Sequence, residues 1–139
     1  MRNKKVEHIG IAVKNLDDTM SFYDDVLGLE KLSVETVESQ GVNIAFFKTG
    51  ETKIELLEPI NDDSPIAKFI SKRGEGIHHM AIEVEDIEAK IEDMNEKGAS
   101  FIGDEPTEGA DDMKVIFVHP KSTNGVLLEL CEPMNEEDK

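Results

Sequence analysis

The sequence lacks several features that define whole classes of protein. It contains one cysteine, Cys131, which excludes an internal disulfide and is typical of proteins in a reducing compartment, so we expect a cytoplasmic protein. It has no run of about 18 apolar residues and no signal-peptide pattern, so we expect no association with a membrane. Tryptophan is absent and tyrosine occurs once.

Basic residues are also scarce. The 139 residues include 15 lysines and arginines against 31 aspartates and glutamates, a net charge of −16. Such a surface repels phosphate backbones, so we expect no nucleic-acid partner. A small anionic ligand held by a few local lysines remains compatible with this charge. The acidic C-terminal segment 135–139 is predicted to be a solvated tail.

The most informative pattern is an internal repeat. VEHIGIAV (6–13) matches IHHMAIEV (77–84), and IELLEP (54–59) matches LELCEP (128–133). The two matches are offset by about 71 and 74 residues, and the longer turn HPKSTNG (119–125) accommodates the difference. Two matches nearly in phase indicate that the chain consists of two similar halves.

Each half is predicted to run strand–helix–three strands, an α+β pattern. Alternation and helical spacing place these elements at 5–13, 15–28, 30–37, 41–48 and 52–58, and again at 77–84, 86–98, 99–103, 114–119 and 125–131. In the first helix, Leu16, Met20, Tyr23 and Leu27 share the apolar spacing. Ser64 and Pro65 begin a short linker helix. We therefore predict one domain, 1–139, built of modules 1–63 and 76–133 joined by the linker 64–75.

The repeat also pairs polar residues that carry chemistry. His8 matches His79, and Glu55 matches Glu129 inside otherwise apolar strands. A carboxylate in such a strand is costly to bury unless it is paired or binds a cation. If the halves pack around a pseudo-two-fold axis, the four side chains converge. Taken singly, each is more often a core or surface residue, but their matched placement favours a divalent-metal site.

The remaining candidates carry weaker signals. His78 neighbours His79 and therefore points to the other face of the strand, which favours a packing role. His119 opens the HPKS turn and is predicted to order it, and Cys131 is by default an inert buried thiol. No catalytic triad, phosphate-binding loop or dinucleotide fingerprint is present.

Several segments resemble a known family. They are HIGIAVKNLDD, FYDDVLGLE, ESQGV, TKIELLEP, DSPIAKFISKRGEGIHHMAIEVEDIEA and HPKSTNGVLLEL, which together span residues 8 to 130. Paired modules with His and Glu in repeat positions resemble the vicinal oxygen chelate superfamily of glyoxalase I, bleomycin-resistance proteins and extradiol dioxygenases. Within it, DSPIAKF, GIHHMA, HPKS and GVLLEL are most similar to the methylmalonyl-CoA epimerases.

The resemblance implies a fold, a metal site and a reaction. The fold is a pair of βαβββ modules whose curled sheets surround a metal-binding cleft, usually in a homodimer. The implied metal ligands are the four matched residues, with Co, Ni, Mn or Zn as the ion. The implied reaction interconverts (R)- and (S)-methylmalonyl-CoA through α-proton abstraction, with Glu129 as the acid/base. Some relatives carry a second glutamate at the position of Ile44, where this chain cannot move a proton, and Glu38 lies nearby.

An acyl-CoA substrate is anionic, so we expect a basic residue to bind it. Among the local cations Lys72, Arg73, Lys114 and Lys121, Lys121 is our choice for substrate binding, because it precedes the Glu129 strand. A glyoxalase I-type isomerase would use the same ligands and the same proton transfer next to a carbonyl. A non-enzymatic drug-binding resistance protein is the other alternative; its acidic surface would suit a cationic drug, but such a protein needs no metal ligands.

Overall fold

The computed structural model describes residues 3–135, so most of the predicted acidic tail lies outside the described residues. These residues divide into two compact units. The first unit is His8–His78, and the second comprises the described parts of Met1–Glu7 and His79–Lys139. No helix among residues 3–135 is long and apolar enough to cross a bilayer.

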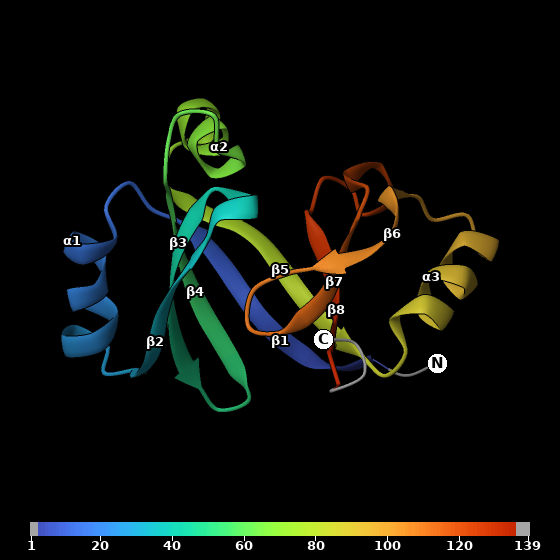
Figure 1. Ribbon diagram of the computed structural model, residues 1–139, viewed down its shortest axis with the longest axis horizontal. Helices are drawn as coiled ribbons and strands as arrows, with labels where there is room; N and C mark the ends of the chain where they lie inside the picture. The colour runs from blue at the N-terminus through green and yellow to red at the C-terminus, as the bar shows by residue number, and fades with distance from the viewer. Residues whose placement is uncertain (1–2, 136–139) are drawn as a thin grey trace. The chain divides into compact units, whose positions relative to one another are not determined.

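The first unit contains four neighbouring strands in the order β2-β3-β4-β1 (Figure 1). β1 runs parallel to β4, whereas β3 is antiparallel to both β2 and β4. The strands are β1 (Asn3–Ala12, shared with the second unit), β2 (Glu30–Val37), β3 (Val42–Thr49) and β4 (Thr52–Pro59). The helical segments are α1 (Leu16–Ser21), the π-helical turn η1 (Phe22–Val26), η2 (Glu38–Gln40) and α2 (Pro65–Arg73).

The second unit repeats this arrangement with the strand order β5-β8-β7-β6. Again the first and last strands of the module are parallel, and the others are antiparallel. Its elements are β5 (Gly76–Val84, begun in the first unit), α3 (Ile87–Glu96), β6 (Phe101–Glu108), β7 (Met113–Val118), η3 (Pro120–Ser122) and β8 (Leu128–Pro133). The predicted order of strand, helix and three strands is therefore confirmed for both halves.

One face of each sheet is covered by its helix. In the first unit α1 packs against β3 and β4 (Figure 1). Leu16 of α1 joins Phe47 and Leu56 in the core. In the second unit α3 packs against β6 and β8, and its residues Ile87 and Ile91 are part of the core of that unit. Because side chains alternate along a strand, His8, Glu55, His79 and Glu129 belong to the opposite faces. We call each of these the site face.

Both helices begin with the same double cap. Asn15 and Asp86 accept hydrogen bonds from backbone N–H groups of the first turn. A second carboxylate comes from the end of the last strand: Leu16 N donates to Glu58 at 2.8 Å, and Ile87 N donates to Glu132 at 2.9 Å. Each helix is thereby attached at its N-terminus to the last strand of its own module.

Replacing Glu132 with alanine is therefore expected to loosen α3. The free energy of unfolding should fall by about 1–2 kcal/mol, because the Ile87 N–H loses a partly buried charged acceptor. Urea denaturation of the parent and the variant measures this change. Replacement of the exposed Glu96 at the other end of α3 is the matched control. Equal stability of the Glu132 variant and the parent would show that the cap contributes nothing.

Several sequence-based boundaries are wrong, and the two largest differences concern the first helix and strand β6. The first helix was expected to remain α-helical up to Gly28, but a π-helical turn follows Ser21, and Leu27 N donates to Phe22 O at 2.7 Å. The wider turn rotates Leu27 out of the apolar stripe, so its side chain is 54% exposed, and Leu29 packs against the core instead. Strand β6 continues past 103 to Glu108, because an irregularity lets this edge strand include Pro106.

Candidate metal centre

The first unit holds a buried histidine–glutamate pair. The parallel register of β1 and β4 places Gly10, which has no side chain of its own, beside Glu55. His8 Nδ1 lies 3.1 Å from Glu55 Oε2. The residues are 6% and 4% exposed, so water does not solvate the carboxylate to any large extent.

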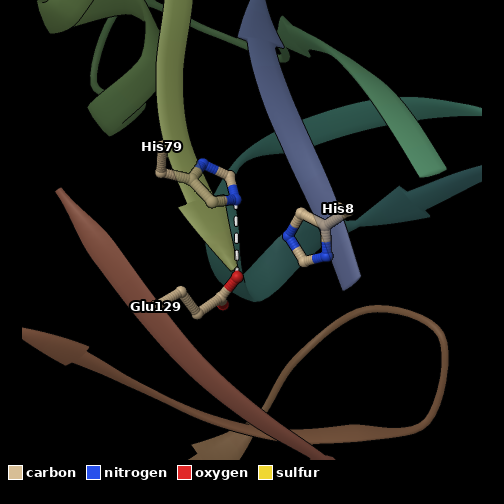
Figure 2. Close-up of side chains that lie close together, drawn as sticks. All are labelled: His8, His79 and Glu129. Atoms are coloured by element: carbon tan, nitrogen blue, oxygen red, sulfur yellow. Dashed lines mark ion pairs between the residues drawn. The ribbon is translucent and has the colours of Figure 1, made fainter. Parts of the chain in front are cut away.

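The second unit holds the equivalent pair. The parallel register of β5 and β8 places Ala81, the repeat partner of Gly10, beside Glu129. His79 Nε2 lies 3.4 Å from Glu129 Oε1, and both residues are buried (Figure 2). The same two side-chain types therefore meet in both units on corresponding pairs of parallel strands, through Nδ1 of His8 and through Nε2 of His79.

The spacing within each pair fits a divalent ion. Two donors bound to one ion at about 2.1 Å, with an angle of about 90–110° between them, lie about 3.0–3.4 Å apart. The measured separations are 3.1 Å for His8–Glu55 and 3.4 Å for His79–Glu129. Imidazole nitrogen and carboxylate oxygen are ligands that Zn, Co, Ni and Mn accept. Each pair therefore suits two positions in the coordination shell of such an ion.

Phenylalanines line both pairs, which the sequence analysis missed. Phe46 lies directly opposite Glu55 in the β3–β4 ladder, and Phe117 lies directly opposite Glu129 in the β7–β8 ladder. The Phe117 ring makes an edge-to-face contact with His79, with ring centroids 5.7 Å apart at 85°. Such a contact holds the imidazole in one orientation. The signal was present, since both phenylalanines occupy the same repeat position.

The other two histidines have structural contacts away from these pairs. The His78 ring packs edge-to-face on Phe69 of α2, with centroids 5.0 Å apart. This contact agrees with the packing role expected from its position beside His79. The His119 side chain accepts a hydrogen bond from Lys121 N at 3.1 Å, which confirms that it orders the HPKS turn.

Lys121 lies on the surface of the second unit. It borders a shallow depression of about 450 Å³, together with Lys97, Ser100 and Ser122. Lys97 Nζ is engaged with Asp93 at 3.0 Å, and this hydrogen bond lowers the pKa of the exposed Asp93 carboxyl. Ser122 Oγ accepts from Ser100 N, which fixes the wall of the depression.

One exposed acidic group is not a metal centre in our interpretation. Asp86, Glu88 and Glu132 have carboxylate oxygens close enough to share an ion. However, Asp86 and Glu132 accept hydrogen bonds from the first turn of α3, and Glu88 pairs with Lys114 at 3.2 Å. Capping and ion pairing account for all three side chains.

Comparisons with known proteins place this chain in a family. Residues 7–117 match the Glyoxalase/Bleomycin resistance protein/Dioxygenase superfamily. The chain is 42% identical to mitochondrial methylmalonyl-CoA epimerase of Mus musculus, over 91% of this chain and 71% of the relative. It is 41% identical to ethylmalonyl-CoA/methylmalonyl-CoA epimerase of Cereibacter sphaeroides, over 91% of this chain and 96% of the relative.

A solved structure agrees with these relatives. A variant of Streptomyces coelicolor methylmalonyl-CoA epimerase, in complex with 2-nitronate-propionyl-CoA, has a TM-score of 0.91 and 37% identity. The match covers 96% of this chain and 100% of that chain, which confirms the α+β vicinal oxygen chelate fold of paired βαβββ modules. The chain belongs to the glyoxalase superfamily and, within it, to the methylmalonyl-CoA epimerase family.

Proposed function

We propose that this chain is a metal-dependent epimerase that interconverts (R)- and (S)-methylmalonyl-CoA. Family membership and the pair of matched, buried His–Glu contacts support this proposal, and the second of these is the observation that carries it. A glyoxalase I-type isomerase and a drug-binding protein rank below it, because the relatives at 42% and 41% identity are epimerases.

The ligands of one divalent ion are, in this proposal, His8, Glu55, His79 and Glu129. Each unit contributes one imidazole and one carboxylate at a separation that suits a common ion. Four protein ligands would leave a six-coordinate ion two positions for substrate oxygens. When bound, the ion supplies Lewis-acid stabilisation of the negative charge that develops on a carbonyl oxygen. Co, Ni, Mn and Zn all accept this donor set.

Glu129 moves the proton in this proposal. Its carboxylate accepts the proton on the carbon between the carboxylate and the thioester of the substrate, and the electron pair of the broken C–H bond delocalises into the thioester. The burial of Glu129 at 5% exposure and the ring of Phe117 across the β7–β8 ladder keep bulk water from that carboxylate. His79 contacts the Phe117 ring and, through its imidazole, orients the Glu129 carboxylate.

Lys121 is proposed to bind an anionic group of the acyl-CoA. The sequence has few basic residues, and Lys121 lies beside two serine hydroxyls in the depression described above. The neighbouring Lys97 adds positive charge, although Asp93 partly neutralises it. A phosphate in this depression would meet ammonium and hydroxyl donors.

Replacing Lys121 with alanine is therefore expected to raise KM for methylmalonyl-CoA about 3- to 10-fold, with little change in kcat, in line with loss of one exposed charge contact of about 1 kcal/mol. Methylmalonyl-pantetheine, which lacks the nucleotide and its phosphates, should show no such rise. Steady-state kinetics with both thioesters make the measurement. An unchanged KM for the CoA thioester would remove Lys121 from the substrate site.

We also propose that the protein is a homodimer and lies in the cytoplasm. β2 is the edge strand of the first-unit sheet and exposes Leu32 and Val34, at 42% and 51%. A second copy covering this strand would remove them from water, and light scattering measures the resulting mass. The single cysteine, Cys131, allows no internal disulfide, which suits a reducing compartment.

Proton exchange tests the epimerase function directly. The metal-loaded parent is incubated with methylmalonyl-CoA in deuterated water, and NMR follows the α-proton. We expect exchange and inversion that both disappear after chelation and return with added metal. A fully loaded protein that leaves the α-proton in place would contradict the proposal.

A further inference from the structure

Inversion at a carbon atom requires two proton-transfer groups or one that changes sides. A proton leaves one face of the planar, delocalised intermediate, and another must arrive on the opposite face. The proposed function assigns Glu129, from the second unit, to one face. We therefore consider the ionisable groups of the first unit as candidates for the second acid/base.

The strand registers define which side chains share the site face of the first unit. Glu35 of β2 lies directly opposite Ile44 of β3, and Ile44 lies directly opposite Leu57 of β4. Directly opposite residues of antiparallel strands point to the same face. Leu57 is two residues from Glu55, so it shares the face of that glutamate. Glu35 therefore belongs to the face that carries the His8–Glu55 pair.

A hydrogen-bond chain on the other face confirms this assignment. Thr36 Oγ1 donates to Asn43 Oδ1 at 2.7 Å, and Asn43 Nδ2 donates to Glu58 Oε1 at 3.0 Å. Glu58 in turn accepts from Leu16 N of α1, so this chain runs along the helix-covered face. Glu35 neighbours Thr36 and by alternation points away from that face.

The ionisable groups on the site face differ in what they can do. In the described part of the first unit they are His8, Glu30, Glu35, Lys48, Lys53 and Glu55. The proposed metal centre uses His8 and Glu55. Glu30, Lys48 and Lys53 lie in the ladder row before the Phe46–Glu55 row on this face, and Glu35 lies in the row after it. Glu35 alone among these six stands in the row of Ile44.

The surroundings of Glu35 suit a proton carrier. Its side chain is half-buried, although the preceding residues of β2 are exposed. It faces Ile44, which is 1% exposed, and directly opposite Cβ atoms lie about 5 Å apart. From the rise per residue and the spacing between strands, Glu35 lies about 7 Å from Glu55 along the strand direction and about 10 Å from it across the sheet. A substrate held between them has room for its α-carbon.

We propose that Glu35 is the second acid/base of the epimerase, acting from the strand next to Ile44; this inference rests on the proposed function. The Glu129 carboxylate takes the α-proton from one face, and the Glu35 carboxylic acid gives its proton to the other. The electron pair delocalised into the thioester forms the new C–H bond. Glu35 ends as a carboxylate and Glu129 as an acid, and turnover of the opposite epimer restores both.

Separate experiments with the two epimers test this role. In Glu35→Gln, loaded with metal to the level of the parent, inversion should fall about 10²-fold or more. One epimer should still exchange its α-proton with deuterated water without inverting, because Glu129 serves that face. The other epimer should neither exchange nor invert. NMR and a chiral assay of the same samples separate exchange from inversion.

Two further variants make the test specific. Glu38→Gln removes an exposed carboxylate three residues away and should invert both epimers like the parent. The double variant Glu35→Gln/Ile44→Glu returns a carboxylate to the same row, one strand closer to Glu55, and should recover at least about 10-fold in inversion. Inversion of both epimers by Glu35→Gln at the parent rate would overturn the assignment. A metal-loaded parent that exchanges no α-proton would instead refute the proposed function.

A binding measurement gives a second readout. With ¹³C-labelled glutamate, addition of 2-nitronate-propionyl-CoA should shift the side-chain carboxyl signal of Glu35, assigned from its absence in Glu35→Gln. The Glu38 signal should stay in place. Saturation with this compound without movement of the Glu35 signal would show that Glu35 does not face the ligand.

Discussion

Replacing His79 with alanine is expected to lower metal affinity by at least about 10²-fold and to abolish epimerase activity at ordinary metal concentrations. Mutation of a residue that only hydrogen-bonds to a metal ligand typically lowers metal affinity about 10–100-fold. Loss of a ligand itself should therefore lower the affinity at least as much. The change also leaves the buried Glu129 carboxylate without the imidazole that lies 3.4 Å away. Metal analysis of the purified variant after dialysis measures the loss.

His78→Ala is the matched control for this variant. The two histidines are adjacent on β5 and point to opposite faces, and His78 packs on Phe69. The His78 variant should retain most of its metal, although it loses a packing contact. Circular dichroism verifies that both variants are folded. Equal loss of metal from both would refute the assignment of faces.

Replacing Glu129 with glutamine is expected to separate metal binding from chemistry. Glutamine keeps one oxygen that can coordinate an ion but cannot accept a proton at neutral pH. The variant should therefore retain some metal, while turnover at matched metal occupancy falls by about 10²-fold or more. The α-proton exchange assay, with the metal measured in the same samples, gives both quantities.

Glu55→Gln is the comparison that gives this result its meaning. Glu55 occupies the same repeat position and contacts His8 at 3.1 Å, but its proposed role is coordination alone. It should be the milder change at equal metal occupancy. A Glu129 variant that exchanges nearly as fast as the parent, or a slower Glu55 variant, would place the base elsewhere.

The repeat made much of the fold predictable. Because matched segments fold alike, HIGIAV and HHMAIEV indicated equivalent strands, and Asn15 and Asp86 indicated equivalent helix starts. The same matching brought forward two histidines and two glutamates, and the structure joins them within each unit as His8–Glu55 and His79–Glu129. That all four share one ion stays a prediction, as do the single domain 1–139 and its boundaries.

Other features depend on tertiary contacts that periodicity does not contain. The spacing of Leu16, Met20 and Tyr23 fits an α-helix and extends to Leu27, yet the chain widens into a π-helical turn. No local sequence pattern distinguishes a continued α-helix from a π-helical turn, because the choice depends on the packing of Leu29 against the core. Helix capping by Glu58 and Glu132 was missed for a different reason: the repeat marked these residues, but a strand-end glutamate usually faces water.

The central claim is that two halves of one chain hold a single divalent ion. Anomalous diffraction at the cobalt edge, from crystals of the cobalt-loaded protein, tests it most directly. We expect one peak per chain, with donor atoms of His8, Glu55, His79 and Glu129 at about 2.0–2.2 Å. Two separate peaks, one at each His–Glu pair, or no peak at either pair would contradict it.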